Sequence, residues 1–144
     1  MSDKPDLVGS WIGTATASSI PSGTLKNLMT FTSDGSVVET RRLFLAESLS
    51  GEIVGTPGHG TWISTGNNEF AATILVLFEG GPNHPTSKGV IMAIEKVRFK
   101  LKLNGEGNRL TGTILDEVRD TNGNIIFDAP GNIEASRIPV EPLP

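Results

Sequence analysis

The stretch Gly9-Ser10-Trp11-Ile12-Gly13-Thr14 decides which fold this chain is expected to adopt, and Gly60-Thr61-Trp62-Ile63-Ser64-Thr65 repeats its pattern about fifty residues later. The two stretches contain the only tryptophans of the protein. Both open runs in which the two faces alternate, which is typical of strands with one buried face. We therefore expect two strands that each place an indole in the interior of an antiparallel sheet.

The rest of the chain has the same character. Its 144 residues suit one domain, and its 17 glycines and nine prolines are typical of many short strands joined by tight turns. Turns are expected at Asp34-Gly35 and over residues 55–60, and Pro130-Gly131 is expected to interrupt the last segment. Besides a strand around Trp62, strands are expected over residues 7–18, 24–32, 36–44, 51–54, 70–78, 90–103, 109–119 and 124–138.

Sequential hairpins of this kind predict an all-β fold, a single antiparallel up-and-down β-barrel of eight or nine strands. Closure of the sheet removes its exposed edges and leaves room for one small ligand. The barrel is expected to span residues 7–138, with a flexible tail over residues 1–6 and a Pro-rich tail over residues 139–144.

Composition argues against several classes of function. The chain has no cysteine, a net charge of −4 and no basic block suited to nucleic acid. Its longest apolar run is about nine residues, too short to span a bilayer, and its first residues lack the apolar core of a secretory signal. We therefore expect a cytoplasmic protein that binds neither nucleic acid nor membrane. No nucleotide-binding glycine motif or metal-ligand spacing occurs, so neither a cofactor nor a metal is expected.

The strand over residues 70–78 points to a protein partner. Eight of its nine residues are apolar, whereas a half-exposed strand would alternate. One face can line the barrel interior, and the other then needs a cover. We therefore expect the chain to self-associate through this strand.

Gly9-Ser10-Trp11 resembles the Gly-x-Trp signature of lipocalins and related calycin-like barrels. Segments 30–35 (Thr-Phe-Thr-Ser-Asp-Gly) and 58–62 (Gly-His-Gly-Thr-Trp) are similar to those of small bacterial lipocalin-like proteins. The resemblance implies that the first Trp closes the barrel base and that an arginine near the end of the chain packs across its ring. Trp11 and Arg137 occupy these positions, so a cation–π contact between them is expected.

The first functional hypothesis is that the barrel binds a small hydrophobic or amphiphilic molecule in its cavity. Trp11 is assigned to the closed end. Trp62, together with His59 and a lid over residues 45–59, is assigned to the working end. The residues expected to contact the ligand are Met29, Phe31, Arg41, Trp62, Phe70 and Phe99.

The second hypothesis is a cofactor-independent cyclase, isomerase or lyase that acts on a flexible apolar substrate in the same cavity. The candidate general acids or bases are His59, Asp116 and Glu39. Asp116 alternates with apolar residues and is expected to be a buried carboxyl with a raised pKa, whereas His84 is expected to be an exposed loop residue. The sequence leaves both hypotheses open, together with a third, a solid barrel that serves only as a subunit.

The strand over residues 36–44 matters for this choice because either of its faces can point inward. If the face of Glu39 and Arg41 is the inner one, two charged groups lie inside the barrel and need each other or a ligand. If it is the outer one, they are surface charges, and the interior receives Val38, Thr40 and Arg42.

Overall fold

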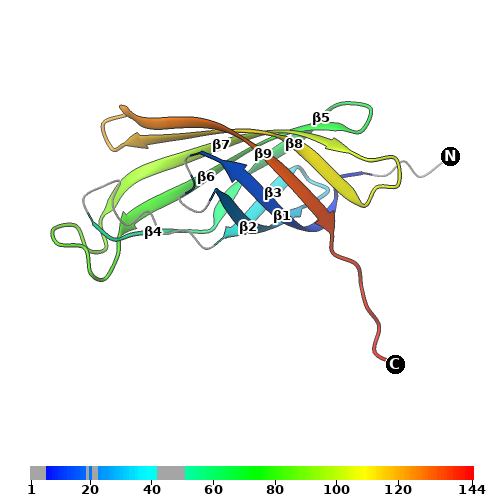
Figure 1. Ribbon diagram of the computed structural model, residues 1–144, viewed down its shortest axis with the longest axis horizontal. Coiled ribbons are helices and arrows are strands. Elements are labelled where there is room, and N and C mark those ends of the chain that lie inside the picture. Colours follow the sequence, from blue (N-terminus) through cyan, green and yellow to red (C-terminus); the bar gives the residue numbers. More distant parts are fainter. Residues whose placement is uncertain (1–5, 19, 21–22, 42–50) are drawn as a thin grey trace.

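The computed structural model describes residues 6–18, 20, 23–41 and 51–144. Within them the chain forms a closed, antiparallel, up-and-down barrel of eight strands with one extra strand, as predicted (Figure 1). The ring runs β1-β2-β3-β5-β6-β7-β8-β9 and returns to β1, and β4 is the extra strand beside β6. The bounds are β1 (Gly9–Ala17), β2 (Thr24–Phe31), β3 (Ser36–Arg41), β4 (Ile53–Gly55), β5 (Gly58–Gly66), β6 (Glu69–Gly80), β7 (Ile91–Leu103), β8 (Arg109–Asp120) and β9 (Ile125–Arg137).

The expected turn over residues 55–60 is wrong, because β5 already begins at Gly58. Gly55 pairs with Phe78 and His59 pairs with Leu75, so β4 and β5 follow each other along the same side of β6. Gly60 allows two backbones to pack closely here. A Cβ atom at Gly60 would overlap the carbonyl of Thr73 on β6. The predicted lid falls partly on these strands and otherwise on residues 45–50, which lie outside the described residues, as do residues 42–44 of the predicted third strand.

The expected interruption at Pro130-Gly131 is also wrong, since β9 runs without a break from Ile125 to Arg137. Pro130 pairs with Leu115 of β8. The pairing of β9 with β1 covers only residues 131–137, so it does not include Pro130. Pro130 therefore has a neighbouring strand on one side only. A missing N–H donor is tolerated at such an edge position.

One end of the barrel is closed by Trp11 and Arg137. The guanidinium carbon of Arg137 lies 4.4 Å from the centroid of the Trp11 ring, and the indole N–H donates to the carbonyl of Leu7. Arg137 also donates to the carbonyls of Asp6, Val8 and Gly107. These bonds join the start of the chain, the β7–β8 turn and the end of β9, so one side chain fixes three segments at this end.

Two groups of buried apolar side chains lie in the interior. We call the larger one the closed-end core and the smaller one the distal core. The buried members of the closed-end core are Leu7, Trp11, Ala15, Met29, Phe31, Val37, Phe70, Ala72, Ile74, Val97, Phe99, Leu101, Leu103, Leu110, Ile114, Ile133 and Ala135. Those of the distal core are Ile53, Val76, Phe78, Ala93 and Val118.

The segment that follows the barrel is irregular. Residues 138–144 have no regular secondary structure, and Figure 1 shows them extending away from the sheet. Val140 and Leu143 are more than nine-tenths exposed. The described residues form no helix with the length and apolar character needed to cross a membrane.

Candidate functional site

Polar side chains lie between the two apolar cores inside the barrel. We call them the interior polar cluster, and its members are Asn27 of β2, Glu39 and Arg41 of β3, Glu95 of β7 and Asp116 of β8. Alternation along the strands places them there. On β7, Glu95 stands between Ala93 of the distal core and Val97 of the closed-end core.

A hydrogen bond and two ion pairs connect four members of the cluster. The Asn27 amide donates from Nδ2 to Oε2 of Glu39 at 2.7 Å. The guanidinium of Arg41 lies beside both glutamates, with its Nε 3.1 Å from Oε1 of Glu39 and its Nη2 against Oε1 of Glu95. The side chains of Arg41, Glu39 and Glu95 are only 11%, 4% and 2% exposed, so water screens these pairs weakly.

The cluster does not satisfy all of its own polar atoms. Neither ion pair of Arg41 has the geometry of a hydrogen bond. Oδ1 of Asn27 and Oδ1 of Asp116 are buried and have no hydrogen-bond partner among the described residues. A buried acceptor without a donor costs about 1–3 kcal/mol, so these atoms mark a position where a donor is lacking.

The orientation of Asn27 follows from its surroundings. Because a carboxylate only accepts hydrogen bonds, the atom of the amide that meets Glu39 must be the nitrogen. The oxygen then points to the inner face of β1, over Gly13, where a Cβ atom would overlap it. Gly13 therefore makes room for the amide of its cross-strand partner Asn27.

Asp116 is a carboxyl whose surroundings shift its pKa. Burial raises the pKa of its carboxyl from 3.8 to about 6, although the nearby positive charge of Arg41 acts in the opposite direction. A carboxyl of this kind exchanges its proton close to neutral pH. It can therefore act as a proton donor or as a proton acceptor.

The face of β3 that the sequence left open is decided by the structure. Glu39 is 3% exposed and Arg41 is half-buried, whereas Val38 and Thr40 are exposed. Inward charges are retained here because Asn27 and Glu95 meet them from other strands. Arg42 lies outside the described residues.

The predicted ligand contacts other than Arg41 all belong to the closed-end core. Met29, Phe31, Phe70 and Phe99 are buried there, and Trp62 packs edge-on against Phe31 and Phe70 at 5.8–6.3 Å between centroids. The indole of Trp62 donates to the carbonyl of Thr32 at 2.9 Å. These side chains form an apolar floor below the cluster.

The assignment of Trp62 and His59 to a separate working end is corrected by these contacts. Thr32 directly follows Phe31, which pairs with Gly9, so Trp62 lies toward the same end as Trp11. His59 is in β5 and its side chain is exposed on the outer face. The sheet therefore separates the imidazole from the interior polar cluster.

His84 was expected to be exposed but is 7% exposed in the β6–β7 loop. Its Nδ1 accepts the backbone N–H groups of Thr86 and Ser87 at 3.2 and 2.9 Å. These bonds give the imidazole a role in fixing the loop.

Sequence reasoning missed Glu95 as a functional residue. The sequence pattern indicated its position, because Glu95 is on the same face of the strand as Val97, Phe99 and Leu101, all of which point inward. An acidic residue at an inward position indicates either a buried ion pair or a ligand contact. Its partner could not be read from the sequence, because Arg41 lies on a strand that is not adjacent to β7.

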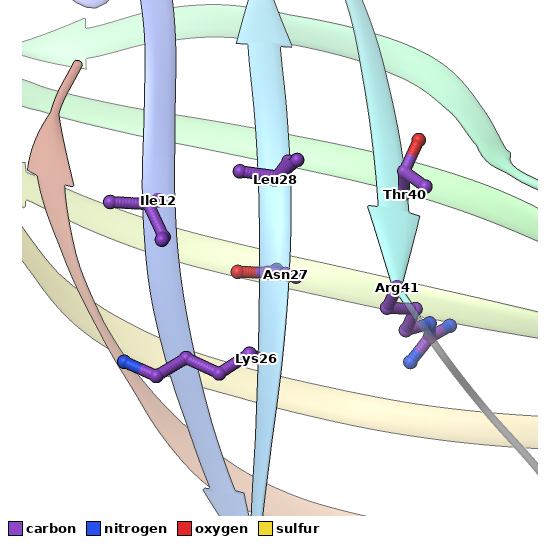
Figure 2. Close-up of a pocket in the computed structure, with 6 residues that line it drawn as sticks. All are labelled: Ile12, Lys26, Asn27, Leu28, Thr40 and Arg41. Carbon is purple, nitrogen blue, oxygen red and sulfur yellow. The ribbon is translucent and has the colours of Figure 1, made fainter.

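A groove of about 490 Å³ lies on the outer face of β1, β2 and β3, and Figure 2 shows the six residues that line it. Ile12 and Leu28 form its apolar part and are 46% and 50% exposed. Lys26 and Thr40 complete the outward side chains, and Arg41 is at the end of β3. The groove is open to solvent, so it lacks the burial that gives the interior polar cluster its unusual chemistry.

The three carboxyls of the cluster do not form a metal centre. Among the described residues, no three or more His, Cys, Asp or Glu side chains converge closely enough to hold a metal ion. Comparison of the chain with protein-family models, curated proteins and solved structures found no match. The case for a function therefore rests on the geometry of the interior.

Proposed function

We propose that the barrel binds a small amphiphilic molecule in its interior, with the polar end of the molecule at the interior polar cluster. The observation that carries this proposal is that two buried acceptors inside a mainly apolar barrel, Asn27 Oδ1 and Asp116 Oδ1, have neither a hydrogen bond nor an ion pair among the described residues. Well-packed apolar residues at such positions are often as stable as a buried ion-pair network, or more stable. A ligand that supplies hydrogen-bond donors would explain why polar residues are present at these positions.

The surroundings of the cluster suit an apolar ligand body. An eight-stranded barrel is just wide enough to be filled by side chains or to hold one small ligand. The walls formed by β1 and β9 add little volume near Asp116 and Asn27, since Ala15, Ala17 and Ala129 project only methyl groups inward. The two apolar cores lie on either side of the cluster and offer surface to a chain or ring.

A second candidate function, proton-transfer catalysis without a cofactor, is favoured by one specific observation. The pKa of Asp116 is raised to about 6, close to the value at which a carboxyl both donates and accepts protons at neutral pH. Arg41 would then stabilise negative charge that develops on a substrate, as an interior cation can. The same interior polar cluster would serve an isomerase, a cyclase or a lyase.

Native mass spectrometry of the purified protein tests binding directly. We expect a co-purified small molecule, or else a rise in melting temperature with members of a library of apolar and amphiphilic compounds. If neither a co-purified molecule nor a rise in melting temperature is found, the binding proposal is wrong and the interior residues serve only to stabilise the barrel. If a ligand is found, incubating it with wild type and with Asp116→Asn separates the two functions, because only a catalyst converts the ligand in a way that depends on Asp116.

A further inference from the structure

We propose that the polar end of the ligand is a cation, a protonated amine on an apolar body, held at the unpartnered acceptors of the interior polar cluster. This inference rests on the proposed binding function and narrows it to one chemical class. Three features of the cluster support it independently: its charge, the kind of atoms left without partners, and the spacing of its carboxyls.

The charge of the cluster is unbalanced. Glu39, Glu95 and Asp116 are three acids, and Arg41 is the one cation that lies beside them among the described residues. The cations of β7, at alternate positions from Lys96 to Lys102, point outward and are exposed. When every acid is ionised, the cluster holds two negative charges more than it can pair. Buried charge without a counter-charge is costly, so a cationic ligand is complementary.

Six buried side-chain atoms of the cluster make no hydrogen bond among the described residues, and four of them, on Glu39, Arg41 and Glu95, lie in the two ion pairs. The two that remain, Oδ1 of Asn27 and Oδ1 of Asp116, are acceptors. Oδ1 of Asn27 accepts hydrogen bonds but cannot donate them, and the nitrogen of the same amide is already bonded to Glu39. Asn27 is 3% exposed, so bulk water does not reach it freely. An ammonium group has three N–H donors and no acceptor, whereas a carboxylate ligand would bring more acceptors and more negative charge. An ammonium group therefore provides both the missing hydrogen-bond donors and the missing positive charge.

The spacing of the carboxyls favours an organic cation over a metal ion. A metal needs several oxygen ligands at about 2.0–2.6 Å, and the described acids are not gathered in that way. A primary ammonium makes hydrogen bonds of about 2.7–2.9 Å to acceptors that can lie farther apart. Its apolar substituent then contacts the neighbouring cores.

The test compares three probes with the same chain length, octylamine, 1-octanol and octanoate, by titration calorimetry at pH 7.5. We expect octylamine to bind at least about tenfold more tightly than 1-octanol, because hydrogen bonds between charged partners are about twice as strong as neutral ones. Octanoate should bind most weakly. Asp116→Asn should weaken octylamine about tenfold and 1-octanol far less, because only the amine loses a charged partner. Glu134→Gln removes a carboxyl on the outer face of β9 and should change neither affinity.

A second arm varies pH with the same probes. The charged groups that share the interior with Asp116 are Glu39, Arg41 and Glu95, and its β9 partner Ala129 is uncharged. Between pH 7.5 and pH 5, octylamine stays protonated while Asp116 takes up a proton. We therefore expect octylamine affinity to fall about tenfold in wild type and to change little in Asp116→Asn.

The outcomes separate this inference from the function on which it rests. Equal affinity for octylamine and 1-octanol, or tighter binding of octanoate, would overturn the preference for a cation and leave amphiphile binding intact. No binding of any probe, in calorimetry and in native mass spectrometry, would overturn both. Loss of octylamine binding in Glu134→Gln but not in Asp116→Asn would place the amine on the outer surface and overturn the inference.

Discussion

Arg41 of β3 and Glu95 of β7 form an ion pair although β5 and β6 separate their strands in the sheet. The guanidinium therefore reaches through the interior and not along the wall. On its own strand it also lies beside Glu39, so one cation stands between two acids from different parts of the barrel. This contact holds the interior polar cluster together across the barrel. Because one arginine serves two glutamates, the cluster has fewer positive than negative charges.

Arg41→Met should destabilise the fold strongly. The substitution removes the cation and leaves Glu39 and Glu95 buried, and breaking a buried pair in this way costs about 3–5 kcal/mol. Chemical denaturation at pH 7 measures the loss. Arg109→Met is the matched control, because Arg109 lies 4.0 Å from Glu134 and both side chains are more than half exposed. It should cost below about 1 kcal/mol, and similar losses for the two variants would contradict the buried pairing.

Asp116→Asn should stabilise the ligand-free protein at neutral pH. The folded pKa of about 6 lies above the ordinary 3.8, so between these values the folded chain keeps a proton that the unfolded chain has released. The stability that Asp116 contributes is therefore complete below pH 3.8, falls as pH rises to about 6 and stays lost above it. The difference is roughly 2–3 kcal/mol.

The measurement is the melting temperature of wild type and Asp116→Asn across pH 4–8. The variant should lack much of the decline that wild type shows between pH 4 and pH 6, and should melt higher at pH 7. A variant whose pH profile parallels that of wild type would show that Asp116 does not titrate in the way its burial requires.

Gly9→Ala should destabilise the closed end. Gly9 has a φ of +134°, which L-residues rarely adopt, and a Cβ atom there would lie 2.6 Å from Nη1 of Arg137. Backbone strain of this kind costs roughly 1–3 kcal/mol. Gly105→Ala is the control, because nothing lies within 4 Å of its added Cβ atom. Thermal denaturation should separate the two, and a neutral Gly9→Ala would refute the link between the Gly-x-Trp motif and Arg137.

Self-association through β6 stays a prediction and can be tested on its outer face. Leu75 and Leu77 are 45% and 41% exposed there, next to Ile94 of β7 at 39%. We expect a dimer in sedimentation velocity at micromolar concentration, and a shift to monomer on Leu75→Lys with Leu77→Lys. Ile125→Lys, at a similarly exposed position on β9, should leave the distribution unchanged. A monomeric wild type would end the idea.

Alternation in the sequence was enough to predict most strands, because a residue's side of a strand follows from parity alone. It placed Asn27 with Met29 and Phe31, and Asp116 with Ile114 and Val118. Errors arose at glycines and prolines. At Gly60 the backbone of a neighbouring strand approaches closely, and at Gly58 the side chain of Ile74 does. At Pro130 one neighbouring strand is missing. None of these conditions can be recognised from local sequence.

The sequence by itself determined the barrel and its closed end at Trp11 and Arg137. It also identified Asp116, Glu39 and Arg41 as candidate site residues. Only the tertiary structure decided that β3 turns its charges inward, that Glu95 joins them, and that His59 and Trp62 do not mark a separate working end. The physical reason is the range of the interactions involved. Strand patterning depends on neighbours two residues apart, whereas the ion pair of Arg41 with Glu95 depends on closure of the sheet, which brings opposite walls of the barrel within reach of one side chain.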